Sequence, residues 1–264
     1  MATALDDKAY SKFKDDIYAL TKIDLSSYKE RQMRRRIDTL ITKNGFKSYD
    51  EFTAAIKKDK ALFEQFVSYL TINVSEFYRN PEQWKHLEEK VFPELLSKFG
   101  HGIRIWSAAC STGDEPYSLV MCLSKFLPLD KIRITATDID DQIIAQAKVG
   151  LYKKQSIASV PEEYKKKYFT KITEDSYQIS EQIKKCVTFK KHNLLKDPYF
   201  KDYHLIVCRN VLIYFTDEAK LEVYKKFNAS LVHDGILFVG STEQVSNYKE
   251  IGYTSPKSFF YQKV

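Results

Sequence analysis

The feature that most constrains this chain is the segment Trp106–Ser118, W-S-A-A-C-S-T-G-D-E-P-Y-S, which joins a strand pattern to a helix pattern. Alternating apolar residues at Ile103 and Ile105 precede it, and apolar residues at helical spacing begin at Leu119. Small, turn-prone residues let a backbone approach a ligand closely and direct helix N–H groups at it. Doubly wound sheets bind nucleotide-like molecules at such a place. A connection without a ligand is the alternative, and this segment alone does not decide between them.

The two halves of the chain differ in the secondary structure that their sequence patterns predict. Residues 1–78 carry only helical patterns, so we expect an N-terminal all-α domain there. Residues 79–264 alternate strand and helix patterns, which favours right-handed crossovers and a mainly parallel, Rossmann-like α/β sheet. The helices predicted for the first half are Asp6–Thr21, Ser27–Lys43, Tyr49–Ile56 and Ala61–Leu70. Those predicted for the second half are Pro81–Lys98, Tyr117–Phe126, Asp141–Lys148 and Asp217–Leu231. The predicted strands are Ile103–Trp106, Ile132–Thr137, Leu205–Cys208 and Ile236–Val239, with Ser258–Val264 as an added strand.

One segment interrupts the alternation. Between Phe169 and Phe189, the tripeptides K-I-T, Y-Q-I and V-T-F have strand character, and the turn-prone T-E-D-S separates the first two. We therefore expect a small antiparallel β insertion at about residues 169–190. A disordered charged loop is the alternative.

Composition excludes several classes of protein. Of the 264 residues, 44% are hydrophobic, which is enough to form a core. The four cysteines are scattered without C-x-x-C spacing, so we expect neither a metal site nor a disulfide framework. No apolar run approaches the roughly 20 residues that span a bilayer, and no secretory pattern begins the chain, which predicts a cytoplasmic location. The net charge of +7 suits nucleic acid, anionic lipid or an acidic protein equally.

The segment Ala136–Asp140, A-T-D-I-D, is the second element of the predicted site. Asp138 ends a predicted strand about 25 residues after Gly113, where an acidic side chain can accept hydrogen bonds from a ribose diol. The alternative is an N-cap for the following helix. The loop lacks G-x-x-x-x-G-K-[ST] and G-x-G-x-x-G, which argues against triphosphates and dinucleotides. S-adenosylmethionine is a nucleoside without phosphates and fits this pattern.

Two further segments carry polar residues that suit the same pocket. C-R-N-V-L-I-Y-F at Cys208–Phe215 follows a predicted strand, and Asn210 at its carboxyl end faces the expected crevice unless it only completes a turn. T-I-N-V-S-E-F-Y-R at Thr71–Arg79 joins the two halves, and domain junctions often line ligand pockets. The alternatives are a surface charge for Arg79 and a core aromatic for Tyr214.

These four segments, in this order, resemble motifs of the CheR family of bacterial chemotaxis methyltransferases. The patterns are N-x-[ST]-x-F-[FY]-R, W-S-A-A-x-S-T-G-x-E-P-Y-S, A-T-D-I-D and C-R-N-V-x-I-Y-F, and the resemblance extends from about Lys8 to the C-terminus. Members of this family methylate glutamate side chains of membrane chemoreceptors with S-adenosylmethionine. The resemblance implies a receptor-docking helical domain, a class I S-adenosylmethionine-dependent methyltransferase sheet and a small antiparallel insertion within it.

The resemblance also implies which residues form the site. Arg79 and Tyr214 are expected nearest the methyl-transfer centre, as catalytic residues, and no metal takes part. A glutamate is ionised near pH 7 and needs positioning rather than a base, which agrees with the absence of a recognisable His or Cys nucleophile. The expected contacts to S-adenosylmethionine, or to its product S-adenosylhomocysteine, are Asn73, Ser75, Arg79, Glu115, Asp138, Asn193, Leu194, Asn210 and Val211.

Three positions depart from the family pattern. Asp114 stands where the family usually has Glu, so we place the cofactor contact on Glu115. G-S-T-E at Gly240–Glu243 replaces the more usual G-H-S-E, which weakens the case for any role of that turn. No glycine lies between Phe169 and Phe189. This argues against a tether to a receptor-tail peptide, which some members dock through a glycine-containing loop of the insertion.

A cluster of arginines lies on one predicted helix. Arg31, Arg34 and Arg35 are spaced i, i+3 and i+4 and share one face, which Arg36 flanks. Such a charge run is most often a solvated face. The resemblance favours docking of the acidic methylation region of a receptor, and it implies recruitment of a cytoplasmic enzyme to receptor arrays without insertion into the membrane.

Two other functions compete with this interpretation. A nucleic-acid methyltransferase fits the positive charge. However, R-N-V-L stands where amino methylation of bases commonly uses [DNS]-P-P-[YFW], so we expect no nucleic-acid partner. A non-catalytic sensor that binds the cofactor and signals to a partner is the other rival, although the presence of all the expected pocket residues argues against lost catalysis.

Overall fold

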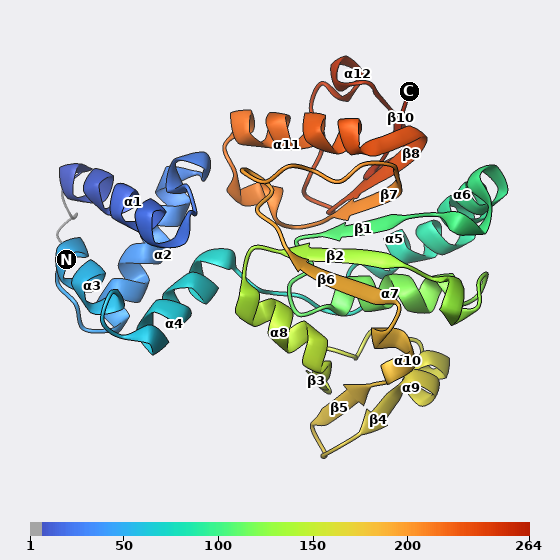
Figure 1. The fold of residues 1–264 in the computed structure, drawn as a ribbon, viewed down its shortest axis with the longest axis horizontal. Helices are drawn as coiled ribbons and strands as arrows, with labels where there is room; N and C mark the ends of the chain where they lie inside the picture. Colours follow the sequence, from blue (N-terminus) through green and yellow to red (C-terminus); the bar gives the residue numbers. More distant parts are fainter. Residues whose placement is uncertain (1–6) are drawn as a thin grey trace. The chain divides into compact units, whose positions relative to one another are not determined.

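The computed structural model describes residues 7–264, which form two compact units (Figure 1). The helical unit contains the described residues up to Asn73 together with a second segment, Tyr214–Lys220. The sheet unit contains Val74–Ile213 and Leu221–Val264. The chain therefore crosses between the units more than once, whereas the sequence predicted a single boundary after residue 78.

Within the described residues up to Asn73, four α-helices pack their apolar faces together. They are α1 (Asp7–Thr21), α2 (Glu30–Lys43), α3 (Tyr49–Ile56) and α4 (Lys60–Thr71). All four predicted helices are confirmed, with small shifts at their ends. Ser48 and Asp59 accept hydrogen bonds from N–H groups in the first turns of α3 and α4, which fixes where these helices begin. The core is aromatic, and the buried rings of Phe13 and Tyr49 lie 4.9 Å apart.

The segment Tyr214–Lys220 joins the helical unit through the backbone. The N–H of Lys29, directly before α2, donates to the carbonyl of Tyr214 at 2.9 Å. Beside it, Tyr28 and Phe215 form an antiparallel bridge, and their rings meet edge to face at 5.0 Å. Tyr214 is therefore fixed at the N-terminal end of α2, although it lies far from that helix in the sequence.

A seven-stranded sheet with the order β6-β2-β1-β7-β8-β10-β9 forms the centre of the sheet unit. Its strands are β1 (Ile105–Ala108), β2 (Ile134–Asp138), β6 (Val187–Lys191), β7 (Tyr203–Cys208), β8 (Leu231–Val239), β9 (Tyr253–Lys257) and β10 (Phe260–Lys263). β6, β2, β1, β7 and β8 are parallel, and β10 is antiparallel to both of its neighbours. The predicted parallel sheet and its added C-terminal strand are thus confirmed. The strand order reverses at β1, and sheets of this kind bind ligands outside the carboxyl ends of the strands at such a point.

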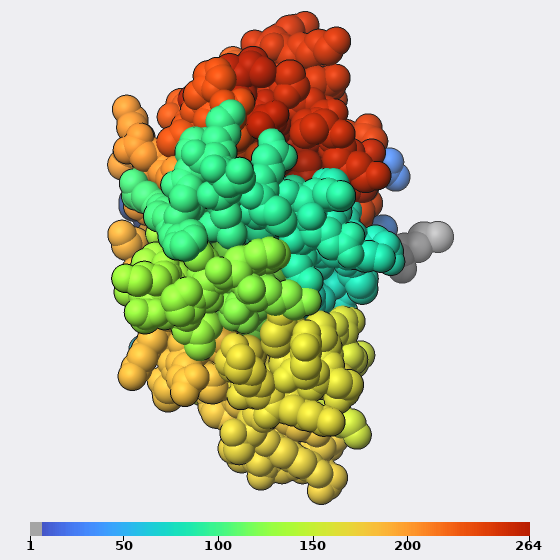
Figure 2. Space-filling view, turned by 90° about the vertical axis from the view of Figure 1, so that its right-hand side faces the viewer, coloured from blue at the N-terminus to red at the C-terminus, as the bar shows by residue number. Residues whose placement is uncertain are grey.

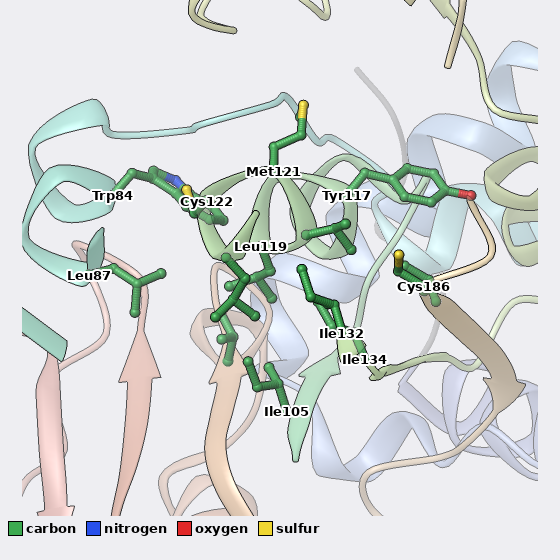
Figure 3. Packing of buried hydrophobic residues seen from close by; sticks show 14 of the residues in the cluster. Trp84, Leu87, Ile105, Tyr117, Leu119, Met121, Cys122, Ile132, Ile134 and Cys186 are labelled. Atoms are coloured by element: carbon green, nitrogen blue, oxygen red, sulfur yellow. The ribbon is translucent and has the colours of Figure 1, made fainter. Parts of the chain in front are cut away.

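The core of the sheet unit lies between the sheet and α7 (Asp114–Leu123), which is buried along nearly its whole length. Figure 3 shows Leu119 of α7 directed toward Ile105 of β1 and Ile134 of β2. The other helices of eight or more residues are α6 (Phe92–Phe99), α8 (Asp141–Val149) and α11 (Asp217–Ser230). A π-helical turn, Leu87–Val91, connects α5 (Pro81–His86) to α6, so the predicted helix from Pro81 is confirmed as one helical stretch. The short helix α12 (Tyr248–Ile251) precedes β9.

A three-stranded antiparallel sheet with the order β3-β5-β4 is inserted between α8 and β6. It forms the lobe drawn in yellow in Figure 2. Its elements are β3 (Leu151–Lys153), α9 (Glu162–Tyr168), β4 (Phe169–Lys171), β5 (Ser176–Ile179) and α10 (Glu181–Lys184). The turn predicted at T-E-D-S is confirmed, because the N–H of Ile172 donates to the carbonyl of Ser176 at 2.9 Å.

The prediction that V-T-F belongs to this insertion was wrong. Val187–Lys191 forms β6, which pairs in parallel with β2 at the edge of the main sheet. Phe189 lies 5.8 Å from the ring of Tyr117 on α7, so burial against the main core decides where this strand pairs. The third strand of the insertion is Leu151–Lys153, which the sequence did not reveal. Among the helices that the structure describes, none has both the length and the apolar content needed to cross a membrane.

Candidate functional site

The loop between β1 and α7 folds tightly against the carboxyl ends of the strands. Ala109, Ser111 and Gly113 have positive φ angles of 66°, 48° and 88°. A positive φ raises the conformational energy of Ala109 and Ser111, because both have a Cβ atom. Backbone strain of this kind is common at ligand sites. A Cβ at Gly113 would lie 3.0 Å from side-chain carbons of Tyr117 and Ala147, so only glycine fits between α7 and α8. The backbone of this loop is thus held in a single compact path.

Asp138 at the end of β2 faces this loop. One carboxylate oxygen accepts the N–H of Ser111 at 2.8 Å, and the other accepts the N–H of Asp140 at 3.1 Å. Burial raises the pKa of Asp138 to about 6, and these N–H groups oppose the shift. The alternative of an N-cap is wrong, because Asp140 accepts both N–H groups at the start of α8. Asp138 therefore binds backbone N–H groups of the loop and of the turn before α8, and does not cap that helix.

Two adjacent carboxylates begin α7. Asp114 is fully buried, accepts a hydrogen bond from the hydroxyl of Thr112, and interacts with the hydroxyl of Ser75. Glu115 accepts the hydroxyl of Ser107 at 2.7 Å. Burial raises the pKa of Asp114 to about 6, against the effect of the Thr112 and Ser75 hydroxyls. Burial raises the pKa of Glu115 to about 7, against the effect of Arg209 and of the Ser107 hydroxyl. A further cation beside these carboxylates would favour their ionised forms.

Arg209 ties the segment that carries Arg79 to the end of β7. Its Nη2 donates to the carbonyl of Arg79 at 2.7 Å, to Asn80 Oδ1 at 3.1 Å and to Gln83 Oε1 at 2.9 Å. Its Nη1 lies 3.8 Å from Glu115 Oε2. Arg209 lies within the motif C-R-N-V-L-I-Y-F, but the motif predicted no role for it. Its position directly after an apolar strand was the one sign in the sequence that Arg209 binds other residues, because a buried charge needs a partner.

The residues after β6 approach the same edge. The N–H of His192 donates to the carbonyl of Asp138 at 2.8 Å, which brings Asn193 and Leu194 beside the end of β2. The N–H of Asn193 donates to Asp197 Oδ2 at 2.8 Å, and the Asn193 side chain accepts the N–H of Leu195 at 2.9 Å. The amide of Asn193 thus stabilises its own turn, while Leu194 is buried.

The sheet unit carries most of the predicted cofactor residues at the carboxyl ends of its strands or in the segment tied to them by Arg209. These residues are Ser75, Arg79, Glu115, Asp138, Asn193, Leu194, Asn210 and Val211. Asn73 and Tyr214 belong to the helical unit, where the amide of Asn73 donates to the hydroxyl of Thr71 at 2.9 Å. Among residues 7–264, no cluster of His, Cys, Asp or Glu is arranged to hold a metal ion, and all four cysteines are free and buried.

The four arginines of α2 differ in their contacts. Arg34 pairs with Asp7 at 2.6 Å, and its guanidinium lies 5.0 Å from the ring centroid of Tyr10. Arg36 donates to the carbonyl of Tyr69 at 2.8 Å, and its guanidinium stacks over the Tyr69 ring, 4.6 Å from the centroid. These two arginines are therefore tied into the helical unit.

Arg31 and Arg35 are exposed on α2, and neither forms an ion pair within the described part of the chain. With Arg34 and Lys43 they line a hollow on the surface of the helix, which also contains the acidic residues Glu30 and Asp38. The spacing predicted that Arg31, Arg34 and Arg35 share one face, and all three line this hollow. Arg34 is also bound within the helical unit, whereas Arg31 and Arg35 are exposed.

Comparison with known proteins decides the family. The CheR methyltransferase SAM-binding domain matches residues 73–258, and the CheR methyltransferase all-alpha domain matches residues 8–71. The chain belongs to the CheR methyltransferase family. A chemotaxis protein methyltransferase of Listeria monocytogenes is 42% identical over 241 residues, which cover 91% of this chain and 92% of the relative. A chemotaxis protein methyltransferase of Borreliella burgdorferi is 32% identical over 265 residues, which cover 93% of this chain and 94% of the relative.

The CheR family confirms the fold expected from the sequence, a class I methyltransferase sheet with an N-terminal all-α domain and an inserted antiparallel sheet. The chain is an S-adenosylmethionine-dependent methyltransferase that acts in chemotaxis. The residues of the crevice fit this cofactor. The hydroxyl of Ser111 is buried without a hydrogen-bond partner among the described residues, next to the N–H that binds Asp138. Asp114, Glu115 and Asp138 all contact this loop or the strand before it, and carboxylates suit the positively charged sulfonium and ammonium groups of this cofactor.

Proposed function

We propose that this methyltransferase transfers the methyl group of S-adenosylmethionine to glutamate side chains of membrane chemoreceptors. The products are glutamate methyl esters and S-adenosylhomocysteine, and the modification serves chemotactic adaptation. The observation that carries the proposal is the exposed pair Arg31 and Arg35, in a hollow of α2, on the unit that also holds Tyr214. Two unpaired guanidinium groups suit an acidic partner that presents carboxylates along a helix. The curated relatives named above act in chemotaxis, which supports the same choice.

The proposed reaction is an in-line substitution at carbon. A carboxylate oxygen of the acceptor forms a bond to the methyl carbon while the bond from that carbon to sulfur breaks, and the electron pair stays on sulfur. The cofactor supplies an activated methyl group and a neutral thioether as the leaving group. The acceptor is already ionised near pH 7, so the protein has to orient it and exclude water rather than remove a proton.

We assign Arg79 and Tyr214 to the orientation of the acceptor carboxylate. A guanidinium and a phenol hydroxyl both donate hydrogen bonds to a carboxylate. The backbone of Arg79 is held by Arg209 and by Trp84, whose Nε1 donates to the Arg79 carbonyl at 2.9 Å. The backbone of Tyr214 is held by the N–H of Lys29. Both side chains therefore start from fixed backbone positions, which reduces the entropy lost on orienting the acceptor.

The same proposal assigns the cofactor contacts. Asp138 would accept hydrogen bonds from the ribose hydroxyls, and Glu115 would face the ammonium group. Asn193 and Leu194 would border the adenine, beside the end of β2. The remaining contacts are assigned to Asn73, Ser75, Arg79, Asn210 and Val211. The partners are the cytoplasmic methylation helices of receptors, which would recruit a cytoplasmic enzyme to receptor arrays without insertion into the membrane. We assign no receptor-tail tether and no nucleic acid as partner.

Transfer of labelled methyl from S-adenosylmethionine to receptor-rich membranes tests the proposal. We expect label in receptor bands as a base-labile ester. The double variant Arg31→Glu and Arg35→Glu should lose most of this transfer while it binds S-adenosylhomocysteine as wild type does. The matched control is Lys58→Glu with Lys60→Glu, which makes the same change of charge at exposed residues outside the α2 hollow and should methylate normally.

The same assay separates the rival functions. Label in added RNA or DNA would replace the proposal with a nucleic-acid methyltransferase. Binding of S-adenosylhomocysteine without transfer to any receptor preparation would favour a non-catalytic sensor. Equal loss of transfer in the α2 variant and in the lysine control would show that total charge, and not the α2 hollow, is recognised.

A further inference from the structure

The turn after β8 holds the loop after β7 through one side chain. Glu243 is buried, and its Oε2 accepts the N–H of Asn210 at 2.6 Å and that of Gly240 at 2.9 Å. Its Oε1 accepts the N–H of Leu212 at 2.7 Å and that of Ile213 at 3.3 Å. A single carboxylate thus binds four backbone N–H groups, three of which belong to the segment between β7 and Tyr214.

These N–H groups require an acceptor of this kind. Asn210 has a positive φ of 60°, so the loop leaves β7 on a path that lacks the hydrogen bonds of a strand or a helix. An ionised carboxylate has only acceptor sites, about four of them, and matches four converging donors. A carboxamide has one acceptor oxygen and would direct its own N–H groups at the rest. The negative charge of Glu243 is therefore needed, and not only its shape.

Gly240 shows that the turn is built around this contact. A Cβ on Gly240 would lie 2.6 Å from Glu243 Oε2 and 2.9 Å from the backbone nitrogen of Asn210. The loop and the turn are thus in direct contact, and no side chain fits between them. The departures from G-H-S-E lie at Ser241 and Thr242, and they leave these contacts intact, because Gly240 and Glu243 make them.

We propose that Glu243 is a positioning residue for S-adenosylmethionine. It fixes the backbone of Asn210 and Val211 before the cofactor binds, and the chain then continues directly into Tyr214. Glu243 acts through this loop and does not itself touch the reacting atoms. The inference rests on the proposed cofactor contacts of Asn210 and Val211.

The test is binding of S-adenosylhomocysteine by titration calorimetry, which needs no methyl acceptor. Glu243→Gln should raise the dissociation constant at least about 10-fold, because buried N–H groups lose their acceptor and the loop is no longer preorganised. The matched control is Ile236→Val, which removes one methylene group at a buried position on β8 and so also lowers stability. This control should bind S-adenosylhomocysteine as wild type does. Equal affinity of the folded Glu243→Gln variant and wild type would overturn the inference.

Hydrogen exchange of the wild-type protein provides a test that does not depend on a variant folding. The amides of Asn210, Leu212 and Ile213 should exchange slowly before S-adenosylhomocysteine is added, because Glu243 already holds them. Fast exchange that slows only on binding would contradict a preformed loop. A wild-type protein that fails to bind S-adenosylhomocysteine would instead refute the proposed cofactor contacts, so the two failures are distinguishable.

Discussion

Buried carboxylates dominate the candidate site at the scale of single residues. Asp114, Glu115 and Asp138 all have pKa values raised by burial, and hydrogen-bond donors of the protein oppose each shift. A carboxylate in such a place is protonated more readily than in water until a ligand stabilises its charge. Cofactor binding at these residues should therefore be coupled to proton release.

Substitution of Asp138 tests its role toward the ribose. Asp138→Asn should weaken S-adenosylhomocysteine binding about 10- to 100-fold, because hydrogen bonds to a charged acceptor contribute about 1.5–3 kcal/mol. The measurement is titration calorimetry at pH 7.5. Asp140→Asn is the matched control, since it makes the same chemical change two residues away and asparagine also caps a helix. Unchanged binding by Asp138→Asn would remove the ribose assignment.

The pKa of Glu115, raised to about 7, predicts a pH dependence of binding. Below pH 7 the side chain is mostly protonated, and the ammonium group of the cofactor favours its ionised form. Affinity for S-adenosylhomocysteine should therefore rise between pH 6 and pH 8, with proton release at pH 7. Calorimetry at pH 7 in two buffers of different ionisation enthalpy measures this release, and Glu115→Gln should remove most of it. Identical enthalpies in the two buffers for wild type would exclude a proton-linked Glu115.

Motifs predicted residues at the ends of strands but not the residues that support them. Asp138 follows directly from the end of a strand, where a local pattern suffices. Glu243 binds Asn210 across 33 positions of the sequence, and Arg209 binds the carbonyl of Arg79 across 130. Their partners are backbone groups, which are present at every position and leave no trace in a sequence pattern. Only the fold shows which backbone groups need a side-chain acceptor or donor.

At the scale of elements, α2 has a buried apolar face and an exposed basic face. Met33, Ile37, Leu40 and Ile41 are buried, as the apolar spacing predicts. Arg36 lies beside this face and binds Tyr69 near the end of α4, whereas Arg31 and Arg35 face solvent. Arginines within a run of six residues can thus be expected to respond differently to the same substitution.

The prediction for α2 compares Arg36 with Arg35. Arg36→Lys should lower the free energy of unfolding by about 1–2 kcal/mol. Lysine cannot both stack a planar group on the Tyr69 ring and donate to the Tyr69 carbonyl as the guanidinium does. Arg35→Lys should change the free energy of unfolding by less than about 0.5 kcal/mol, as expected for an exposed side chain. Urea denaturation followed by circular dichroism measures both. Equal stability of the two variants would show that Arg36 does not stabilise the helical unit.

Periodicity located the long elements and failed for short ones. The helices of the helical unit were predicted because each has several turns of apolar spacing. β3 has only three residues, of which Tyr152 alone is buried, so its pattern is too short to detect. V-T-F was recognised as a strand but placed in the wrong sheet, because strand character does not specify a pairing partner. The partner of β6 is chosen by Phe189, which packs on a helix more than 60 residues earlier in the chain.

At the scale of the whole molecule, the two units share one chain in an interleaved way. The loop after β7 belongs to the sheet unit as far as Ile213, and the next residue, Tyr214, belongs to the helical unit. The candidate catalytic residues Arg79 and Tyr214 therefore come from different units. The sequence could predict both units, because one has only helical patterns and the other alternates strand and helix patterns. It could not predict this second crossing, because the bridge that causes it joins two single residues, Tyr28 and Phe215, far apart in the sequence.

The bridge between Tyr28 and Phe215 limits how the helical unit can be exchanged between relatives. A graft that replaces only the first 73 residues would bring in a foreign partner for Phe215 and a foreign donor for the Tyr214 carbonyl. The ring contact of Phe215 and the backbone pairing of Tyr214 would then depend on residues from two different proteins. An exchange of the whole helical unit has to carry Tyr214–Lys220 as a second, separate insert. Two separate stretches of the gene thus encode this unit, and recombination at a single point would transfer only one of them.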